Sequence, residues 1–126
     1  MVAAVIERDG RLLLGLRPAE KRHGGLWEFP GGKLDGAETA AEAAHRELKE
    51  ELSVEVTGVG ERLTTIRDEG SPFAIEFYRV VVEGEPVAIE HNEVRWFSPD
   101  ELGEYSLAPA DTAFATWLVA DRLREV

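Results

Sequence analysis

Cysteine is absent from the 126-residue sequence. Without thiols the chain has no disulfide, no zinc–thiolate site and no cysteine nucleophile, and a reducing cytoplasm is the expected setting. A basic leader and a long apolar segment are missing too, because the opening MVAAVIERDG is apolar over too short a run for a signal peptide or a membrane span. We therefore expect a cytoplasmic protein with no membrane partner.

Basic residues are few. Fourteen Lys and Arg stand against 25 Asp and Glu, which gives a formal net charge of −11. Such a surface repels polyanions, so a nucleic acid polymer is excluded as the main partner. A small phosphate-bearing ligand remains compatible with this charge if metal ions mediate the contact.

No low-complexity tract, internal repeat or linker interrupts the chain. Its length and its 44% hydrophobic content predict a single domain over residues 1–126. Residues 2–17 are expected to form two paired strands around an Asp9-Gly10 turn, followed by a short strand WEF that ends at Pro30 and two glycines. Alternating β-branched residues predict further strands at 54–67, 73–83 and 93–97.

Helices are predicted in three places, which makes the fold class α/β. Thr39 is the expected cap of a helix over 39–52, whose apolar residues recur at three- and four-residue spacing: Ala40, Ala41, Ala44, Leu48 and Leu52. The segment Ser98-Pro99-Asp100-Glu101 matches a capping box that starts a short helix. A last helix is expected from about Ala110 to Arg124, with Phe114, Trp117 and Leu118 facing the core.

The helix over 39–52 carries clustered carboxylates. Glu47, Glu50 and Glu51 fall on one stripe, and Arg46 lies four residues before Glu50, where it is expected to hold that side chain. A solvated helix face is one interpretation, because charge runs usually serve solubility. However, the carboxylates repel each other and oppose the helix dipole, and hard cations such as Mg²⁺ prefer oxygen ligands. Metal binding would therefore explain the arrangement.

The spacing of these residues resembles a known family motif. Gly32, five residues, Glu38, seven residues and then Arg46-Glu47-Leu48-Lys49-Glu50-Glu51-Leu52-Ser53-Val54 are similar to the Nudix box, G-x5-E-x7-R-E-U-x-E-E-x-G-U, where U is a bulky apolar residue. The one departure is Ser53 in place of glycine, where we expect a left-handed turn at a modest cost. The resemblance implies a Nudix fold, an α/β/α sandwich with a mixed β-sheet between helices.

The resemblance extends over nearly the whole chain. The stretches ERDGRLLLGLRP, GLWEFPGGK and SLAPAD are similar to MutT-type nucleoside triphosphate pyrophosphohydrolases, especially the branch acting on CTP and on oxidised nucleotides such as 8-oxo-dGTP. This implies Mg²⁺- or Mn²⁺-dependent hydrolysis of a nucleoside triphosphate to monophosphate and pyrophosphate, in nucleotide-pool housecleaning. The resemblance by itself does not choose the base.

By the same resemblance, Glu47, Glu50 and Glu51 are metal ligands together with the Gly31 carbonyl. Glu47 and Glu50 also have catalytic roles in orienting or activating the attacking water. Arg46 is the residue that orients a glutamate.

Related enzymes supply a further glutamate from outside the box, as metal ligand or base. Glu93 in HNEVRW matches this position. It is equally well interpreted as an exposed strand residue, and the neighbouring Glu90 competes for the role.

Two basic residues are matched to phosphate contacts. Arg17 follows the second predicted strand, and Lys33 follows the glycine pair. The alternatives are a surface arginine that ends a hairpin and a solvated loop lysine.

The base-binding side is matched to Glu28, Phe29 and Pro30, with Asp111 facing them. Asp111 has a second interpretation as a helix cap. Its carboxylate would accept from the amino group of cytosine or from the N–H edge of guanine, so both bases stay open.

Two other functions compete with this one. A hydrolase of ADP-ribose or of another nucleoside diphosphate derivative is the first, although such relatives tend to carry an extra N-terminal region used in dimerisation, so we expect a monomer. A non-catalytic nucleotide-binding Nudix module is the second, for which loss of box carboxylates would be expected, and none is lost.

Overall fold

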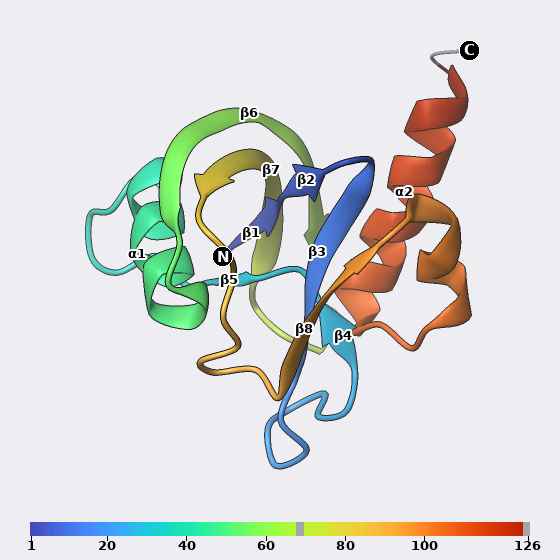
Figure 1. Cartoon of the computed structure of the whole chain (residues 1–126), viewed down its shortest axis with the longest axis horizontal. Helices are drawn as coiled ribbons and strands as arrows, with labels where there is room; N and C mark the ends of the chain where they lie inside the picture. Colours follow the sequence, from blue (N-terminus) through green and yellow to red (C-terminus); the bar gives the residue numbers. More distant parts are fainter. Residues whose placement is uncertain (68–69, 125–126) are drawn as a thin grey trace.

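The computed structural model describes residues 1–67 and 70–124, whose strands form two sheets (Figure 1). The first has the order β5-β1-β7-β6, with β5 (Gly31–Gly32), β1 (Val2–Val5), β7 (Ala74–Glu83) and β6 (Glu55–Arg67). In the second, β3 (Arg11–Leu16) pairs with β2 (Glu7–Arg8), β4 (Trp27–Glu28) and β8 (Glu93–Phe97). The first sheet is mixed, because β1 and β7 are parallel and its other pairs are antiparallel.

The helices lie on opposite sides of the strands, α1 (Ala40–Leu52) on one and α2 (Pro109–Arg124) on the other (Figure 1). A 3-10 helix, η1 (Pro99–Glu104), comes after β8. This confirms the predicted α/β architecture and its helices, including the short one after Ser98. Among the described residues, no helix is long and apolar enough to cross a membrane.

The predicted pairing within residues 2–17 is wrong in one respect. The turn forms as expected, with positive φ at Asp9 (52°) and Gly10 (77°), but the hairpin that it closes is β2–β3. The preceding segment Val2–Val5 instead lies in the other sheet, between β5 and β7. All four of its residues are buried, as expected of a central strand that is covered on both faces.

Gly31 and Gly32 do not simply end a strand, as the sequence predicted, but form β5 against β1. Gly31 has φ 154°, and a Cβ there would clash with the Val2 carbonyl. This close approach brings the start of β1 beside the segment that leads into α1.

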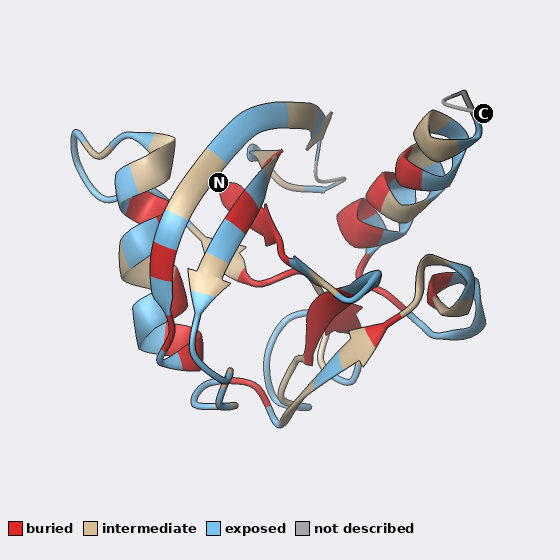
Figure 2. Cartoon of the chain, turned by 45° about the horizontal axis from the view of Figure 1, so that its top comes forward, coloured by how far each residue is buried: buried red, intermediate tan, exposed pale blue. Residues whose placement is uncertain are grey.

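The cap of α1 is confirmed. The Thr39 Oγ1 accepts from the Glu42 N–H (3.2 Å), and the Glu42 carboxylate accepts from the Thr39 N–H (3.0 Å). Figure 2 shows the buried positions of α1 on the side that faces the sheet. Leu48 and Leu52 pack there with Val80 of β7.

The other half of the core lies under α2. Phe114 stacks on Phe77 with ring centroids 4.1 Å apart, and Leu118 is also buried. Trp117, predicted to face the core, is partly buried against the same cluster. Each helix therefore covers its own apolar cluster.

Ser53 ends α1 in the left-handed conformation that the sequence predicted, with φ 56° and ψ 38°. Its N–H donates to the Lys49 carbonyl (3.1 Å). Because glycine adopts this conformation without a Cβ penalty, we expect Ser53→Gly to raise the free energy of unfolding by about 0.5–1 kcal/mol, measured by urea denaturation. Ser53→Ala keeps the penalty and is the control; an equal gain in that variant would contradict the explanation.

Candidate functional site

A cavity of about 570 Å³ opens between the two sheets' edges and the start of α2. Its wall joins segments that are far apart in the sequence, and it includes seven of the residues predicted for the site: Arg17, Glu28, Phe29, Gly31, Lys33, Glu51 and Asp111. Glu90 and His91 also line it. The cavity wall therefore carries more acidic than basic side chains.

Glu51 is a buried acid of this cavity, with 4% of its surface exposed. Its Oε2 is buried and has no hydrogen-bond partner among the described residues. Burial raises the pKa of Glu51 to about 9, with further contributions from the charges of Glu47, Glu28 and Glu90. A buried, unpaired carboxylate among other carboxylates is costly, and a cation beside it would offset that cost.

Glu47 lies one helical turn before Glu51 and packs against the backbone of Gly32. A Cβ added at Gly32 would lie 2.6 Å from the Glu47 carboxylate carbon. The absence of a side chain at Gly32 therefore makes room for this carboxylate beside the cavity.

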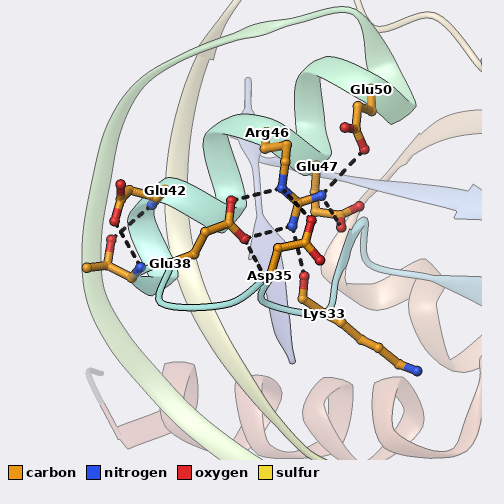
Figure 3. Close-up of polar contacts among 8 residues, drawn as sticks. Lys33, Asp35, Glu38, Glu42, Arg46, Glu47 and Glu50 are labelled. Carbon is orange, nitrogen blue, oxygen red and sulfur yellow. Dashed lines mark hydrogen bonds and ion pairs between the residues drawn. The ribbon is translucent and has the colours of Figure 1, made fainter.

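Arg46 anchors the acidic side chains around α1 (Figure 3). Its Nε and Nη2 each donate to the Glu38 carboxylate at 2.8 Å, its Nη1 donates to Glu47 at 2.9 Å, and its Nη2 donates to the Lys33 carbonyl at 3.0 Å. The hydrogen bond from Arg46 is the main reason that the pKa of Glu38 falls to about 2. The sequence predicted that Arg46 would hold Glu50, but Glu50 lies at 3.5 Å and is the weaker partner.

Glu50 points further outward than its two neighbours, with 53% of its side chain exposed. Across residues 1–67 and 70–124, no three His, Cys, Asp or Glu side chains already converge as a ligand set. Hard divalent cations prefer oxygen ligands. The unpaired Glu51 Oε2 and the Glu47 carboxylate one helical turn away would supply such oxygens.

Glu93 lies outside the cavity wall that the described residues form. Its carboxylate accepts from the Nε (3.1 Å) and Nη2 (2.8 Å) of Arg95. Glu90 lines the cavity instead, and its charge contributes to the raised pKa of Glu51. The structure therefore places Glu90, not Glu93, beside the predicted metal ligands.

Arg17 and Glu28 form an ion pair at the cavity wall. The Arg17 Nη1 donates to both Glu28 oxygens, at 3.0 and 3.1 Å, and its Nε donates to the Arg22 carbonyl at 2.6 Å. Lys33 also lines the cavity and places its Nζ 4.6 Å from the centre of the Phe73 ring. Arg17 is therefore engaged with protein groups, while Lys33 is exposed at the cavity wall.

Phe29 and Pro30 are core residues, which limits their predicted contact with a base. The Phe29 ring is 3% exposed and packs edge-on against Phe77 and Phe114. Pro30 is fully buried and is not part of the cavity wall formed by the described residues.

Asp111 lies in the first turn of α2, inside the helix that begins at Pro109. It is 6% exposed, and its Oδ1 accepts from the Phe29 N–H at 2.9 Å. Burial raises the pKa of Asp111 to about 8, although the Phe29 hydrogen bond opposes this shift. The backbone of Phe29 thus fixes Asp111 at the cavity.

His91 is the residue that sequence reasoning left without a role. It is buried, and its Nε2 lies 2.9 Å from the Glu28 Oε2 and 3.9 Å from the Glu51 Oε1. The signal in the sequence was its position beside Glu93, which would have allowed it to touch the site.

The fold and this acidic cavity define a NUDIX domain. The NUDIX family model matches residues 1–118, so the chain belongs to this family. It is 46% identical to CTP pyrophosphohydrolase of Escherichia coli (strain K12) over 114 residues, which cover 88% of this chain and 84% of that protein. It is 36% identical to putative 8-oxo-dGTP diphosphatase 2 of Mycobacterium tuberculosis (strain ATCC 25618 / H37Rv), with coverage of 88% and 81%.

Solved structures agree with this assignment. The solution structure of the Escherichia coli ORF135 protein has a TM-score of 0.80 and 43% identity, and the alignment covers 96% of this chain and 88% of that one. A MutT structure from the study of Aliivibrio salmonicida and Vibrio cholerae has a TM-score of 0.76 and 27% identity, with 95% of each chain covered. These likenesses confirm the predicted Nudix fold and the MutT-type resemblance.

Proposed function

We propose that this Nudix hydrolase converts nucleoside triphosphates to monophosphates and pyrophosphate, with CTP-type or oxidised nucleotides as substrates. The observation that carries the proposal is the buried Glu51 carboxyl, whose Oε2 has no hydrogen-bond partner among the described residues, in a cavity that Glu28 and Asp111 also line. The names of the relatives, a CTP pyrophosphohydrolase and an 8-oxo-dGTP diphosphatase, support the same chemistry. The whole chain would act as one catalytic domain.

Nudix hydrolases generally need divalent cations, and we propose Mg²⁺ or Mn²⁺ here. Glu47, Glu50 and Glu51 would hold the cation together with the Gly31 carbonyl. When bound, it would neutralise phosphate charge and act as a Lewis acid. Arg46 would keep Glu47 in place, so that little reorganisation is needed during the reaction.

For the further glutamate, Glu90 replaces Glu93 in the proposal. Its place on the cavity wall would allow it to accept a proton from the attacking water or to bind the cation. Lys33 would contact phosphate oxygens, and Arg17 would do so only by sharing its guanidinium with Glu28.

The base would lie between Glu28 and Asp111. Burial raises the pKa of Asp111, which favours its protonated form, so that Asp111 would offer a hydrogen-bond donor and Glu28 an acceptor. Such a pair complements the acceptor and donor of a cytosine edge and also those of a guanine edge. The choice between the two bases therefore needs measurement.

The test is pyrophosphate release with Mg²⁺ across CTP, dCTP, 5-methyl-dCTP, dGTP, 8-oxo-dGTP and ADP-ribose. We expect turnover of cytosine or oxidised-guanine triphosphates. Cleavage confined to ADP-ribose, scored by release of AMP, would favour the competing hydrolase. Nucleotide binding without any cleavage would favour a non-catalytic module.

Glu50→Gln tests the role of the most exposed box glutamate. Because this side chain is half exposed, the variant should keep the wild-type melting temperature. Loss of a carboxylate that acts on the metal or the water should lower turnover by roughly 10²–10³-fold. Near-normal turnover would remove Glu50 from the mechanism.

The monomeric state, the cytoplasmic location and the exclusion of nucleic acid polymers stay predictions. Light scattering of the purified protein and a binding assay with single- and double-stranded DNA would test the first and the last.

A further inference from the structure

Gly15 of β3 leaves a space in the second sheet that another residue fills. It lies opposite Glu28 of β4 on one side and Val94 of β8 on the other. A Cβ added at Gly15 would lie 2.5, 2.6 and 2.8 Å from the Cδ2, Cγ and Nδ1 of His91. The imidazole therefore occupies the position that a side chain at Gly15 would take.

From this position His91 reaches the carboxylate of Glu28. Its Nε2 lies 2.9 Å from the Glu28 Oε2, and its side chain is 4% exposed. An ionised carboxylate only accepts hydrogen bonds, so the Nε2 carries the proton and donates. The other nitrogen, Nδ1, is buried and has no hydrogen-bond partner among the described residues.

The backbone around His91 is held on both sides. Before it, the N–H of Val87 donates to the Leu52 carbonyl (2.9 Å), and that of Ile89 donates to the Glu51 carbonyl (3.1 Å). After it, the N–H of Asn92 donates to the carbonyl of Leu16 in β3 (2.9 Å). These bonds tie the loop to the end of α1 and to β3, so the imidazole is presented in a fixed place.

Glu28 needs such support because of its neighbours. It stands near the buried carboxylate of Glu51, whose pKa its charge helps to raise. On the other side, the Arg17 Nη1 donates to both Glu28 oxygens, so a single nitrogen makes both of these contacts. The hydrogen bond from the His91 Nε2 to the Glu28 Oε2 holds the carboxylate from a second side.

We propose that His91 is a positioning residue that holds the Glu28 carboxylate for recognition of the nucleobase of the triphosphate. This inference builds on the proposed function, in which Glu28 contacts the base. In this role His91 would act on the base only through Glu28. Its loss should therefore weaken substrate binding more than it slows the chemical step.

The first experiment is a double-mutant cycle in kcat/KM with CTP, using His91→Phe, Glu28→Gln and the pair. We expect His91→Phe to raise KM about tenfold or more, the effect of one hydrogen bond to a charged group, with kcat changed by less than about threefold. The double variant should be no worse than Glu28→Gln, because both changes remove the same contact. Additive losses, or a fall in kcat at constant KM, would overturn the proposal.

Rescue and control variants separate positioning from packing. His91→Gln carries an N–H at a similar reach and should recover most of the lost affinity, whereas failure of this rescue would count against the hydrogen bond. His45→Phe makes the same change at an exposed histidine of α1 and should leave KM unaltered. Thermal melts of all variants verify folding.

Gly15→Ala tests the position of the His91 ring by adding a methyl group on β3 where the ring lies. Its φ is not in the left-handed region, and the three atoms nearest to the added methyl all belong to His91. The variant should therefore raise KM in the wild type and have no further effect in a His91→Ala background. An equal effect in both backgrounds would show that the methyl acts elsewhere.

A second readout separates this inference from the proposed function. If the wild type hydrolyses no nucleoside triphosphate, the proposed function fails, but the contact between His91 and Glu28 is still measurable. The unfolding equilibrium constants of the same four proteins should then show at least about fivefold coupling between His91→Phe and Glu28→Gln. Independent effects on unfolding would overturn the positioning role.

Discussion

Glu51→Gln is expected to make the metal-free protein more stable and at the same time to lower its Mg²⁺-dependent turnover by roughly 10²–10³-fold. The gain in stability arises because the Glu51 carboxyl is buried with one oxygen unpaired. The loss of turnover arises because the amide carries no charge with which to hold a cation. Higher stability together with lower turnover would show that the Glu51 carboxylate serves activity at a cost in stability.

The size of the stability gain depends on pH. Burial raises the pKa of Glu51 from 4.5 to about 9, so the folded protein keeps a proton that the unfolded chain releases above pH 4.5. The free energy of unfolding of the metal-free wild type therefore falls as pH rises from about 4.5 to 9, by up to about 1.4 kcal/mol per unit. The glutamine variant should therefore be more stable than the wild type at pH 8, and by a smaller margin at pH 6.

Urea denaturation at pH 6 and pH 8 in EDTA measures this difference, and added Mg²⁺ should stabilise the wild type but not the variant. Glu61→Gln, an exposed glutamate on β6, is the matched control and should alter neither stability nor turnover. A glutamine variant that is less stable than the wild type in EDTA would contradict the role assigned to Glu51.

Arg46→Lys is the second change with a large expected effect. Lysine keeps the charge but loses the planar fork that donates to Glu38, Glu47 and the Lys33 carbonyl together. Glu47 would then shift from its place beside Gly32, and kcat should fall by roughly 100-fold, the effect of a misplaced catalytic group. Arg62→Lys changes an exposed arginine that pairs with one glutamate, and it should leave kcat unaltered.

Acid stability gives an independent measure of the Arg46 contacts. The pKa of Glu38 is lowered from 4.5 to about 2, so this pair contributes stability above pH 4.5 and loses it as pH falls to about 2. The difference in stability between wild type and Arg46→Met should therefore shrink across this range. A difference that stays constant between pH 5 and pH 2 would show that Arg46 stabilises the fold by packing alone.

Much of α1 follows from local sequence. The spacing of Leu48 and Leu52 predicts the buried side, Thr39 and Glu42 predict the cap, and Ser53 predicts the left-handed end, all of which the structure contains. The strand 93–97 also has the predicted bounds. These features depend on residues within one or two turns of each other, which is why periodicity and capping rules describe them.

The assignments that failed concern partners far away in the chain. Val2–Val5 looked like half of a hairpin, but its apolar residues needed cover on both faces, which β5 and β7 provide. The contact of Phe29 with a base stays a prediction, because this residue packs on Phe77 and Phe114 in the core and also lines the cavity. Nothing in the immediate sequence shows that one aromatic residue belongs to both.

By itself, the sequence determined the family and the acidic helix with the glutamates predicted to bind metal, because a motif on one helix has a fixed geometry. Only the tertiary structure decided that Glu90 rather than Glu93 faces the cavity, and that His91 fills the space above Gly15 to reach Glu28. The reason is physical: the loop before β8 is held by the carbonyls of α1 and β3. Its direction is set by backbone groups that lie 35 or more residues away in the chain, and no local pattern encodes it.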